Sequence, residues 1–561
     1  MIASTLDANR KVHEFRPSPG NLFNGLPLPF IPRHQKGISF MFTIIVDAFG
    51  KGVFRSIALT VLVSIVWSTC ALADHGFDPN FHPEYAIDAF SSVGGNAARQ
   101  GGKLVRLPGG EVVIAGRVRM SNDSPPYWNI GLLRLGRSGE RKVWPGSPDG
   151  VHFWADGEYV VYPNLANAGV GDGRIESVND IGHADGRIYV LATRVFSEAP
   201  FDRDVVVYAF DESGTFRQSF IAIGSAIDEV GRSLDVKETG LIAAPVAITI
   251  LAERNFQKMV VAKVHENQAG DLQADAGFNA GAPLQVDIST SCAGSPQCNV
   301  IPNDLVRPQR LFGGDGMPIY VAGAVQRSGG DWDYLAVKLN ADGTLAGDFG
   351  VGGLRYVPFN QPGSGQGDYA MTLHVESSFG PFGTDTLWLA GNVQQSCQTG
   401  IGVAKLRGDG VDDPFFGTNG RAVYGGSIET GSVCAQDPAH FASDITLQGG
   451  EIAIAGDTAT LDQGGQTLVD GSLLRIHADT GSQRGLASLP MTFGLGDRAG
   501  ASRLRGIVGD GGGRYTVSGE GDVMLLYPTL FIAARTWHSD TLFANEFDQI
   551  VPQSLTLDGT P

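Results

Sequence analysis

Two short sequence patterns alternate along most of this chain and recur in the same order seven times. The first is an apolar run that ends in Ala-Gly or a variant, found at 111–116, 187–193, 248–253, 318–323, 386–391, 451–456 and 514–519. The second is an apolar run that leads into a turn, found at 128–140, 204–215, 259–271, 333–344, 401–411, 471–482 and 529–540. The Ala-Gly position recurs at a mean spacing of about 67 residues, so the pattern is an internal repeat. Seven such units fill residues 74–548 and leave no room for a separate catalytic domain.

The best-preserved unit shows what one repeat folds into. Leu335, Val337 and Leu339 alternate with the residues between them, and a period of two predicts a strand with two distinct faces. The segment 340–343 (NADG) predicts a turn, so the strands on either side form a hairpin. A single sheet of three or four strands would expose both faces and both edges. Stacking seven around an axis buries the faces, which predicts an all-β fold: a single β-propeller with about seven blades of short antiparallel strands.

Composition agrees with this fold and excludes several classes of protein. The chain has 77 Gly and 29 Pro in 561 residues, while charged residues are only 18%, which argues against long solvated helices. Hydrophobic residues make up 42%, so the chain is not intrinsically disordered. The formal net charge of −18 provides no basic surface for nucleic acid, so we expect no nucleic-acid partner.

The first 73 residues predict export. Residues 1–40 are interpreted as disordered or as a mis-assigned upstream extension, and 41–73 as a signal peptide. Its apolar run, 57–67, ends near Ala71-Leu72-Ala73, which is a cleavage signature. The run is shorter than the roughly 20 residues needed to cross a bilayer, so no transmembrane anchor is expected in the mature chain. A lipid anchor at Cys70 is the alternative. We therefore expect a bacterial protein that is secreted or lies in the periplasm or cell envelope.

The termini of residues 74–548 also carry predictions. Phe-Gly or Phe-Asn elements follow the second pattern in units three to five, at 277–281, 348–353 and 415–420. The seventh unit lacks this element, while 76–81 (GFDPNF) resembles it, so an N-terminal strand is expected to complete the last blade. Residues 549–561 are expected to form a flexible C-terminal tail.

Four cysteines remain after removal of the signal peptide: Cys292, Cys298, Cys397 and Cys434. An even number in an exported chain predicts disulfides. Cys292 and Cys298 most simply pair across a short loop, which leaves Cys397 and Cys434 as the second pair, although three pairings are open.

Residues 321–353, with VAG followed by DYLAVKLNADGTLAGDFG and GG, resemble the delta-60 repeat of bacterial secreted proteins. The resemblance is close in that unit and partial at 107–140, 386–420 and 451–482. It implies a propeller-like β architecture and export, and it brings no catalytic residues.

Candidate site residues are few. Two acidic loops, with Asp331 and Asp333 in one and Asp409, Asp412 and Asp413 in the other, are candidates for binding Ca²⁺, the one cofactor considered. Turn formation explains Asp-Gly sequences without a metal.

The pair Asp331/Asp333 could also serve glycoside hydrolysis. Trp128 and Trp332, which begin second-pattern strands, are candidate stacking platforms for sugars, and packing is the alternative.

Three functions remain open. The first is an exported, non-catalytic binding or scaffold propeller whose partner is an unknown protein or glycan, held by variable loops such as 118–127, 195–203, 324–332, 392–400 and 457–469. The second is a secreted hydrolase acting on polysaccharide, and the third is a structural cell-surface protein. The fold alone does not choose among them.

Overall fold

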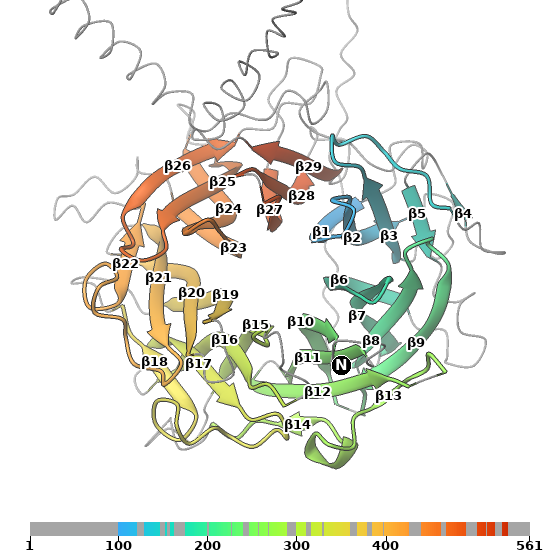
Figure 1. Ribbon diagram of the computed structural model, residues 1–561, viewed down its shortest axis with the longest axis horizontal. Coiled ribbons are helices and arrows are strands. Elements are labelled where there is room, and N and C mark those ends of the chain that lie inside the picture. The colour runs from blue at the N-terminus through green and yellow to red at the C-terminus, as the bar shows by residue number, and fades with distance from the viewer. Residues whose placement is uncertain are drawn as a thin grey trace, which may run out of the picture. The chain divides into compact units, whose positions relative to one another are not determined.

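Figure 1 shows seven small antiparallel sheets standing as blades around a common axis in the computed structural model. The structure describes residues 99–119, 128–145, 152–153, 158–161, 174–198, 201–225, 227–238, 246–255, 257–267, 269–288, 299–309, 316–327, 330–359, 367–378, 384–395, 398–425, 439–461, 467–489, 502–511, 513–521 and 530–536. These residues confirm the expected fold, a seven-bladed β-propeller.

Blades 1 to 3 follow in chain order, each beginning with its innermost strand. Blade 1 contains β1 (Arg99–Arg106), β2 (Val112–Arg119), β3 (Trp128–Leu135), β5 (Glu158–Val161) and β4 (His152–Phe153). Blade 2 contains β6 (Arg174–Ala184), β7 (Arg187–Glu198), β8 (Phe201–Asp211) and β9 (Phe216–Ile223). Blade 3 contains β10 (Glu229–Glu238), β11 (Val246–Arg254), β12 (Lys258–Glu266), β13 (Leu272–Ala274) and β14 (Leu284–Gln285), with the short 3-10 helix η1 (Asn279–Gly281).

Blades 4 to 7 repeat the arrangement. Blade 4 contains β15 (Val300–Val306), β16 (Ile319–Gln326), β17 (Trp332–Leu339) and β18 (Leu354–Val357). Blade 5 contains β19 (Asp368–Ser377), β20 (Asp385–Gln394), β21 (Thr399–Arg407) and β22 (Arg421–Tyr424). Blade 6 contains β23 (Ala439–Gln448), β24 (Glu451–Leu461), β25 (Thr467–His477) and β26 (Gln483–Leu489), and blade 7 contains β27 (Ser502–Gly509), β28 (Tyr515–Gly521) and β29 (Leu530–Thr536).

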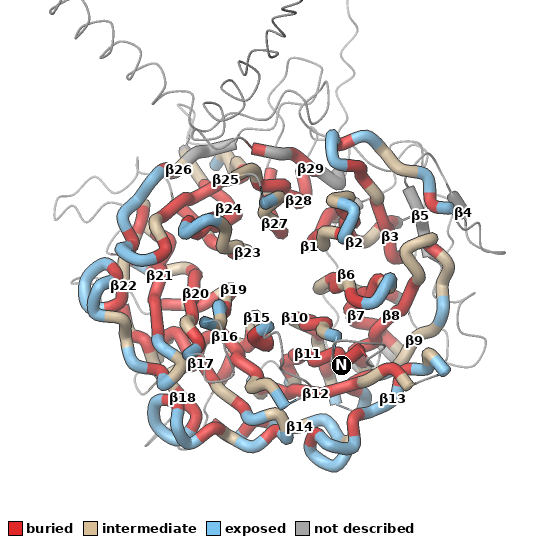
Figure 2. Tube along the Cα trace, viewed as in Figure 1, coloured by how far each residue is buried: buried red, intermediate tan, exposed pale blue. Residues whose placement is uncertain are grey.

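The repeated patterns are the second and third strands of each blade, as the positions of β16 and β17 show. Leu335, Val337 and Leu339 pack in the apolar cluster shared with blade 3, whereas Tyr334 and Ala336 pack in the cluster shared with blade 5. Figure 2 shows the second and third strands buried along most of their length, while exposed residues concentrate in the turns, both at the outer rim and beside the innermost strands. The core is therefore divided into layers between blades.

The Phe-Gly elements join neighbouring blades. Phe349 of blade 4 is fully buried, and a Cβ on Gly410 of blade 5 would come within 3.2 Å of its ring. Gly410 has φ +80°, which favours glycine at this turn. The N–H of Gly350 donates to the carbonyl of Asp409 at 2.8 Å. The same clasp recurs with Phe278 against Gly343 and with Phe416 against Gly481.

The ring closes between blades 7 and 1. Ser518 of β28 donates to the carbonyl of Gly102 in β1 at 2.7 Å, and Arg106 donates to the carbonyl of Gly509 at 2.8 Å. The N-terminal segment expected to complete the last blade, 74–90, lies outside the described residues, as do the proposed signal peptide and tail.

The two faces of the ring differ in their connections. Within each blade the strands are antiparallel, so all links from second to third strand fall on one face, here called the upper face. The five variable loops predicted to hold a ligand are these links in blades 1, 2, 4, 5 and 6. The turns from first to second strand lie on the opposite, lower face. Within the described ranges, no helix has the length and apolar content that a membrane crossing requires.

Candidate binding site: the axial cluster and the upper face

Every innermost strand carries a β-bulge near its middle. In β15 the register with β16 shifts between Pro302 and Asp304, and in β23 it shifts between Ala442 and Asp444. A bulge turns the local side chain away from the regular pleat. One residue stands at the same place in each bulge. These residues are Lys103, Asp180, Ser233, Asp304, Thr372, Asp444 and Gly506. The six with side chains are called the axial cluster.

The carboxylates of the axial cluster fasten one blade to the next. Asp180 accepts hydrogen bonds from the backbone N–H of Ile181 in its own strand and of Leu234 in blade 3, both at 2.8 Å. The single hydroxyl of Ser233 lies within hydrogen-bond distance of both carboxylates, 3.1 Å from Asp180 and 2.7 Å from Asp304. Asp304 and Asp444 make the same kind of contact with the blade that follows them. Asp304 accepts the N–H of Leu373 in blade 5, and Asp444 accepts the N–H of Ile507 in blade 7, both at 3.0 Å. Carboxylates on blades 2, 4 and 6 thus hold blades 3, 5 and 7.

Lys103 is the cation of the axial cluster. Its Nζ lies 2.8 Å from Oδ1 of Asp444. Burial alone would lower the pKa of Lys103, but the charges of Asp444, Asp304 and Asp180 outweigh burial and raise it. Burial raises the pKa of Asp180 to about 7, against the opposing effect of Lys103. The oxygens of these carboxylates already accept hydrogen bonds between blades, so they serve the architecture rather than acid–base chemistry on a substrate.

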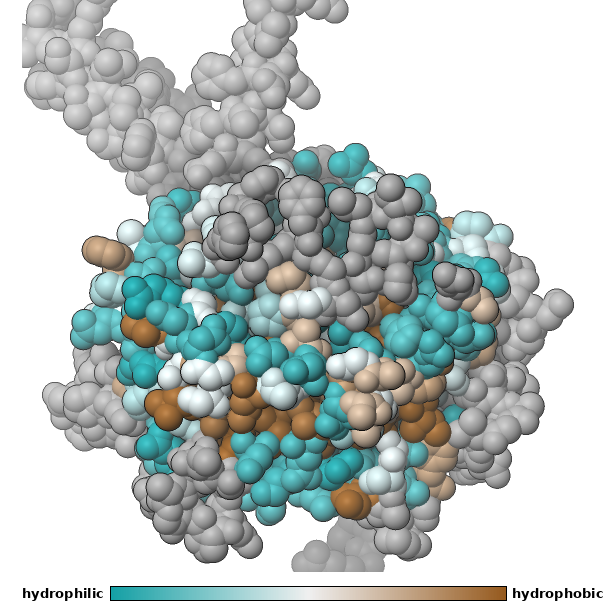
Figure 3. All heavy atoms as spheres, turned by 60° about the horizontal axis from the view of Figure 1, so that its bottom comes forward, coloured by the Kyte–Doolittle hydropathy of each residue, from teal (hydrophilic) through white to brown (hydrophobic). Residues whose placement is uncertain are grey.

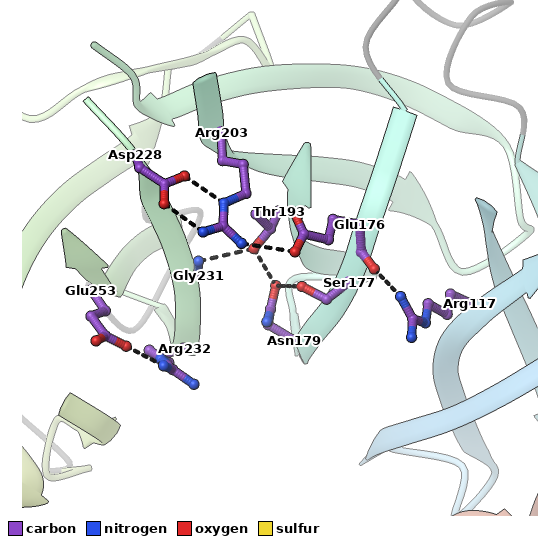
Figure 4. A network of polar contacts seen from close by, with 10 residues as sticks. All are labelled: Arg117, Glu176, Ser177, Asn179, Thr193, Arg203, Asp228, Gly231, Arg232 and Glu253. Atoms are coloured by element: carbon purple, nitrogen blue, oxygen red, sulfur yellow. Dashed lines mark hydrogen bonds and ion pairs between the residues drawn. The ribbon is translucent and has the colours of Figure 1, made fainter. Parts of the chain in front are cut away.

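A second polar tier lies on the upper face over blades 1 to 3 (Figure 4). Arg203 pairs with both oxygens of Asp228 and reaches Glu176 at 2.8 Å. Thr193 donates to Asn179 at 3.0 Å and accepts the N–H of Gly231 in blade 3 at 3.0 Å. The figure also shows Arg117 of blade 1 donating to the carbonyl of Glu176, and Arg232 paired with Glu253. Arg203 and Arg232 of this tier are therefore neutralised by carboxylates, whereas Arg117 donates to a backbone carbonyl.

The two predicted tryptophan platforms occupy the same strand position in non-adjacent blades. Trp332 is half-buried at the start of β17, and its ring centroid lies 5.4 Å from that of Tyr369 in blade 5, with the planes tilted by 31°. Trp128 is half-buried at the start of β3, and the guanidinium of Arg117 lies 4.3 Å from its ring centroid. The structure therefore gives Trp332 an aromatic neighbour across a blade boundary, and it places a cation on Trp128.

Carboxylates gather beside the Trp332–Tyr369 pair. Asp368, which precedes Tyr369, is 5% exposed and accepts the N–H of Phe359 at 3.1 Å. Burial raises the pKa of Asp368 to about 6, and the charges of Asp333 and Asp331 add to the effect. Asp333 is 4% exposed, its Oδ1 has no hydrogen-bond partner among the described residues, and burial together with Asp331 raises its pKa.

The predicted residues Asp331 and Asp333 thus lie near a third carboxylate that sequence reasoning missed. Asp368 and Tyr369 begin an innermost strand, and these strands lack the Ala-Gly signature that marked the others. Their approach to Trp332 comes from the packing of blade 5 on blade 4, which no local pattern encodes.

The second acidic loop is already neutralised by protein cations. Asp412 pairs with Arg355 at 2.6 Å and with Arg421 at 2.9 Å, and Asp413 pairs with Lys405 at 3.1 Å. Asp409 accepts the N–H of Val411 at 3.0 Å, which is turn chemistry. This donor set does not fit a Ca²⁺ ion, which needs six or more oxygens able to turn toward it.

Two further predictions concern metal and disulfide sites. Across the ranges that the structure describes, no group of three or more His, Cys, Asp or Glu side chains is arranged to hold a metal ion. Cys292, Cys298, Cys397 and Cys434 lie outside those ranges, so their pairing stays a prediction.

Comparison with solved structures finds proteins of similar fold whose sequences are only 9% identical to this one. No protein-family model and no curated protein matches the sequence. Similar solved structures include a protein of unknown function from Dyadobacter fermentans (9% identity, TM-score 0.35, covering 81% of this chain and 99% of that one). They also include phage phi92 endosialidase (9% identity, TM-score 0.37, covering 87% of this chain and 72% of that one). A third is polysaccharide lyase Uly1 (9% identity, TM-score 0.37, covering 77% of this chain and 89% of that one). At these values the likeness carries no inference about what this chain binds.

Proposed function

We propose that this protein is an exported propeller of delta-60 type that binds a glycan on its upper face without catalysing a reaction. The observation that carries the proposal is the half-buried Trp332–Tyr369 pair beside Asp331, which is itself half-buried; Asp333 is buried and pairs with Arg327 at 3.4 Å. Aromatic rings pack against the apolar faces of sugars, and carboxylates accept hydrogen bonds from sugar hydroxyls. These two chemistries meet here on the face that carries the variable loops.

The composition of the site suits a polar ligand. On the side shown in Figure 3, apolar residues are interspersed among hydrophilic ones. A binding site recognises a polar ligand through a few polar groups held at fixed positions around an apolar contact surface. Trp332 provides the apolar surface here, and its acidic neighbours provide the polar groups.

The hydrogen bonds that the axial carboxylates already accept support a binding function rather than a catalytic one. A glycosidase needs two carboxyl groups that face the scissile bond. Asp180, Asp304 and Asp444 instead accept hydrogen bonds from neighbouring blades.

A hydrolase acting on polysaccharide is the second candidate, and one observation favours it. Asp368 has a pKa raised to about 6, which suits a proton donor near neutral pH. It lies next to Tyr369 and within the electrostatic influence of Asp333.

A binding screen followed by product analysis tests both candidates. Purified protein is melted with a panel of cell-wall fragments and common polysaccharides, and a ligand specific to the folded state raises the melting temperature. The affinity for each positive glycan is then measured for Trp332→Leu and for the matched control Trp128→Leu. We expect binding to weaken at least tenfold in the first and to stay within about twofold in the second, since a lost aromatic contact of about 1.5 kcal/mol is tenfold.

The products of the same incubation separate the candidates. An unchanged glycan supports the binding function, whereas new reducing ends that disappear in Asp368→Asn support the hydrolase. Failure of every glycan to shift the melting temperature would contradict both and favour a scaffold for proteins or a structural surface protein.

A further inference from the structure

A cavity of about 310 Å³ lies on the lower face where blade 7 meets blade 1. Its lining includes three arginines and one carboxylate: Arg106, Arg137, Arg514 and Asp510. Arg514 pairs with Asp510 through Nε at 3.0 Å, and Arg106 donates to the carbonyl of Gly509 at 2.8 Å. The lining therefore contains three arginine side chains and one carboxylate in a chain whose formal net charge is −18.

The boundary between blades 3 and 4 provides an internal comparison. Arg307 stands three positions after the bulge residue of blade 4, as Arg106 does in blade 1. Arg307 is 4% exposed, and its Nε donates to Oδ2 of Asp235 in blade 3 at 2.9 Å. The guanidinium at this boundary is thus matched by a carboxylate of the preceding blade.

The matching carboxylate is missing from the sequence of blade 7. Asp235 lies two positions after the bulge of β10 and pairs in register with Thr249. The residue at the same place in β27 is Val508, which pairs in register with Thr516. Val508 and Thr516 both line the cavity. The cavity therefore lies where an acidic side chain would neutralise Arg106, and two more arginines border it.

Because guanidinium groups bind carboxylate, phosphate and sulfate through paired N–H donors, this geometry selects an oxyanion. We propose that the cavity binds a small oxyanion, a carboxylate, phosphate or sulfate group, in the place that the Asp235 carboxylate occupies between blades 3 and 4. The bound anion contacts blades 7 and 1 together and stabilises the closure of the ring.

The test compares anions at matched ionic strength. The purified protein is melted in a zwitterionic buffer with sodium chloride, phosphate, sulfate or glucuronate, and affinity is measured by titration calorimetry. We expect at least one of the three oxyanions, and not chloride, to raise the melting temperature saturably. A response to phosphate and sulfate assigns a tetrahedral anion, and a response to glucuronate assigns a carboxylate ligand such as an acidic sugar.

Three variants make the test specific. Arg514→Gln is expected to weaken binding at least tenfold, whereas Arg407→Gln, which removes an exposed arginine from a turn of blade 5, leaves it unchanged. Val508→Asp supplies the missing carboxylate, so it raises the melting temperature in chloride and abolishes the response to the oxyanion.

Two results would overturn the proposal. The first is the absence of a saturable response to all three oxyanions in the wild-type protein. The second is an equal loss of affinity in Arg514→Gln and Arg407→Gln, which would indicate general screening of charge.

Discussion

Replacing Lys103 with methionine tests whether the axial cluster holds the blades together. The substitution keeps most of the apolar stem and removes the charge. It leaves Oδ1 of Asp444 without the ammonium group that lies 2.8 Å away. It also removes the cation that offsets Asp304 and Asp180.

The expected cost follows from the burial of the pair. Breaking a buried ion pair by removing one partner costs about 3–5 kcal/mol. The side chains of Lys103 and Asp444 are 23% and 18% exposed, so water relieves part of that penalty. We therefore expect the free energy of unfolding to fall by about 2–3 kcal/mol near neutral pH.

The pH dependence of this loss identifies its electrostatic cause. In the wild-type protein the pKa of Asp180 is already raised to about 7. Without Lys103 the pKa values of Asp180 and Asp304 rise further, so these two carboxylates take up protons in the folded variant at a pH where the unfolded chain is still ionised. Stability then increases as the pH falls, and the deficit of the variant shrinks between about pH 8 and about pH 5.5.

Equilibrium urea unfolding followed by tryptophan fluorescence at these two pH values measures the effect. Asp444→Asn in the Lys103→Met background should restore part of the stability, because the unpaired charge is removed. A deficit equal at both pH values, or no deficit, would refute the role assigned to the axial cluster.

Three further predictions concern the clasps, a half-buried histidine and the acidic loop. Phe349→Ala should lower the free energy of unfolding by about 3–5 kcal/mol, since it empties the space beneath Gly410; a loss below about 1 kcal/mol would contradict the clasp. Burial, with a smaller effect of a nearby lysine, lowers the pKa of His374 from 6.5 to about 4, so the unfolded chain binds a proton first and stability falls as the pH drops through this range. His374→Gln should remove about 3 kcal/mol of that acid-induced loss in urea titrations, and an unchanged pH profile would refute it. Adding millimolar Ca²⁺, or a chelator, should leave the melting temperature unchanged because Asp412 and Asp413 already pair with cations; a rise that the chelator reverses would restore the metal hypothesis.

The sequence predicted the strands whose side chains alternate without interruption. β17 reads as a strand because both of its faces pack against neighbouring blades, and its turn residues follow directly. The innermost strands escaped prediction because their bulges break the period of two, as at Pro302 and Asp304 in β15. The polar residues that follow the bulges gained a role only when the ring brought them together.

The candidate site was predicted in part for the same physical reason. Trp332 stood out because it begins a recognisable strand, and Asp331 and Asp333 flank it. Their neighbour Tyr369 belongs to the next blade, so its contact with Trp332 depends on packing between blades. Asp409 was ambiguous because a turn and a metal site favour the same residue types, and its hydrogen bond to the N–H of Val411 identifies the turn.

The most direct test of the proposed function is the affinity of the wild-type protein and Trp332→Leu for a glycan that raises the melting temperature, measured by titration calorimetry with product analysis of the same sample. The account predicts saturable binding by the wild-type protein, at least tenfold weaker binding by Trp332→Leu, and an intact glycan. Equal affinity in the two proteins would contradict the assignment of the site, and cleavage of the glycan would contradict a function without catalysis.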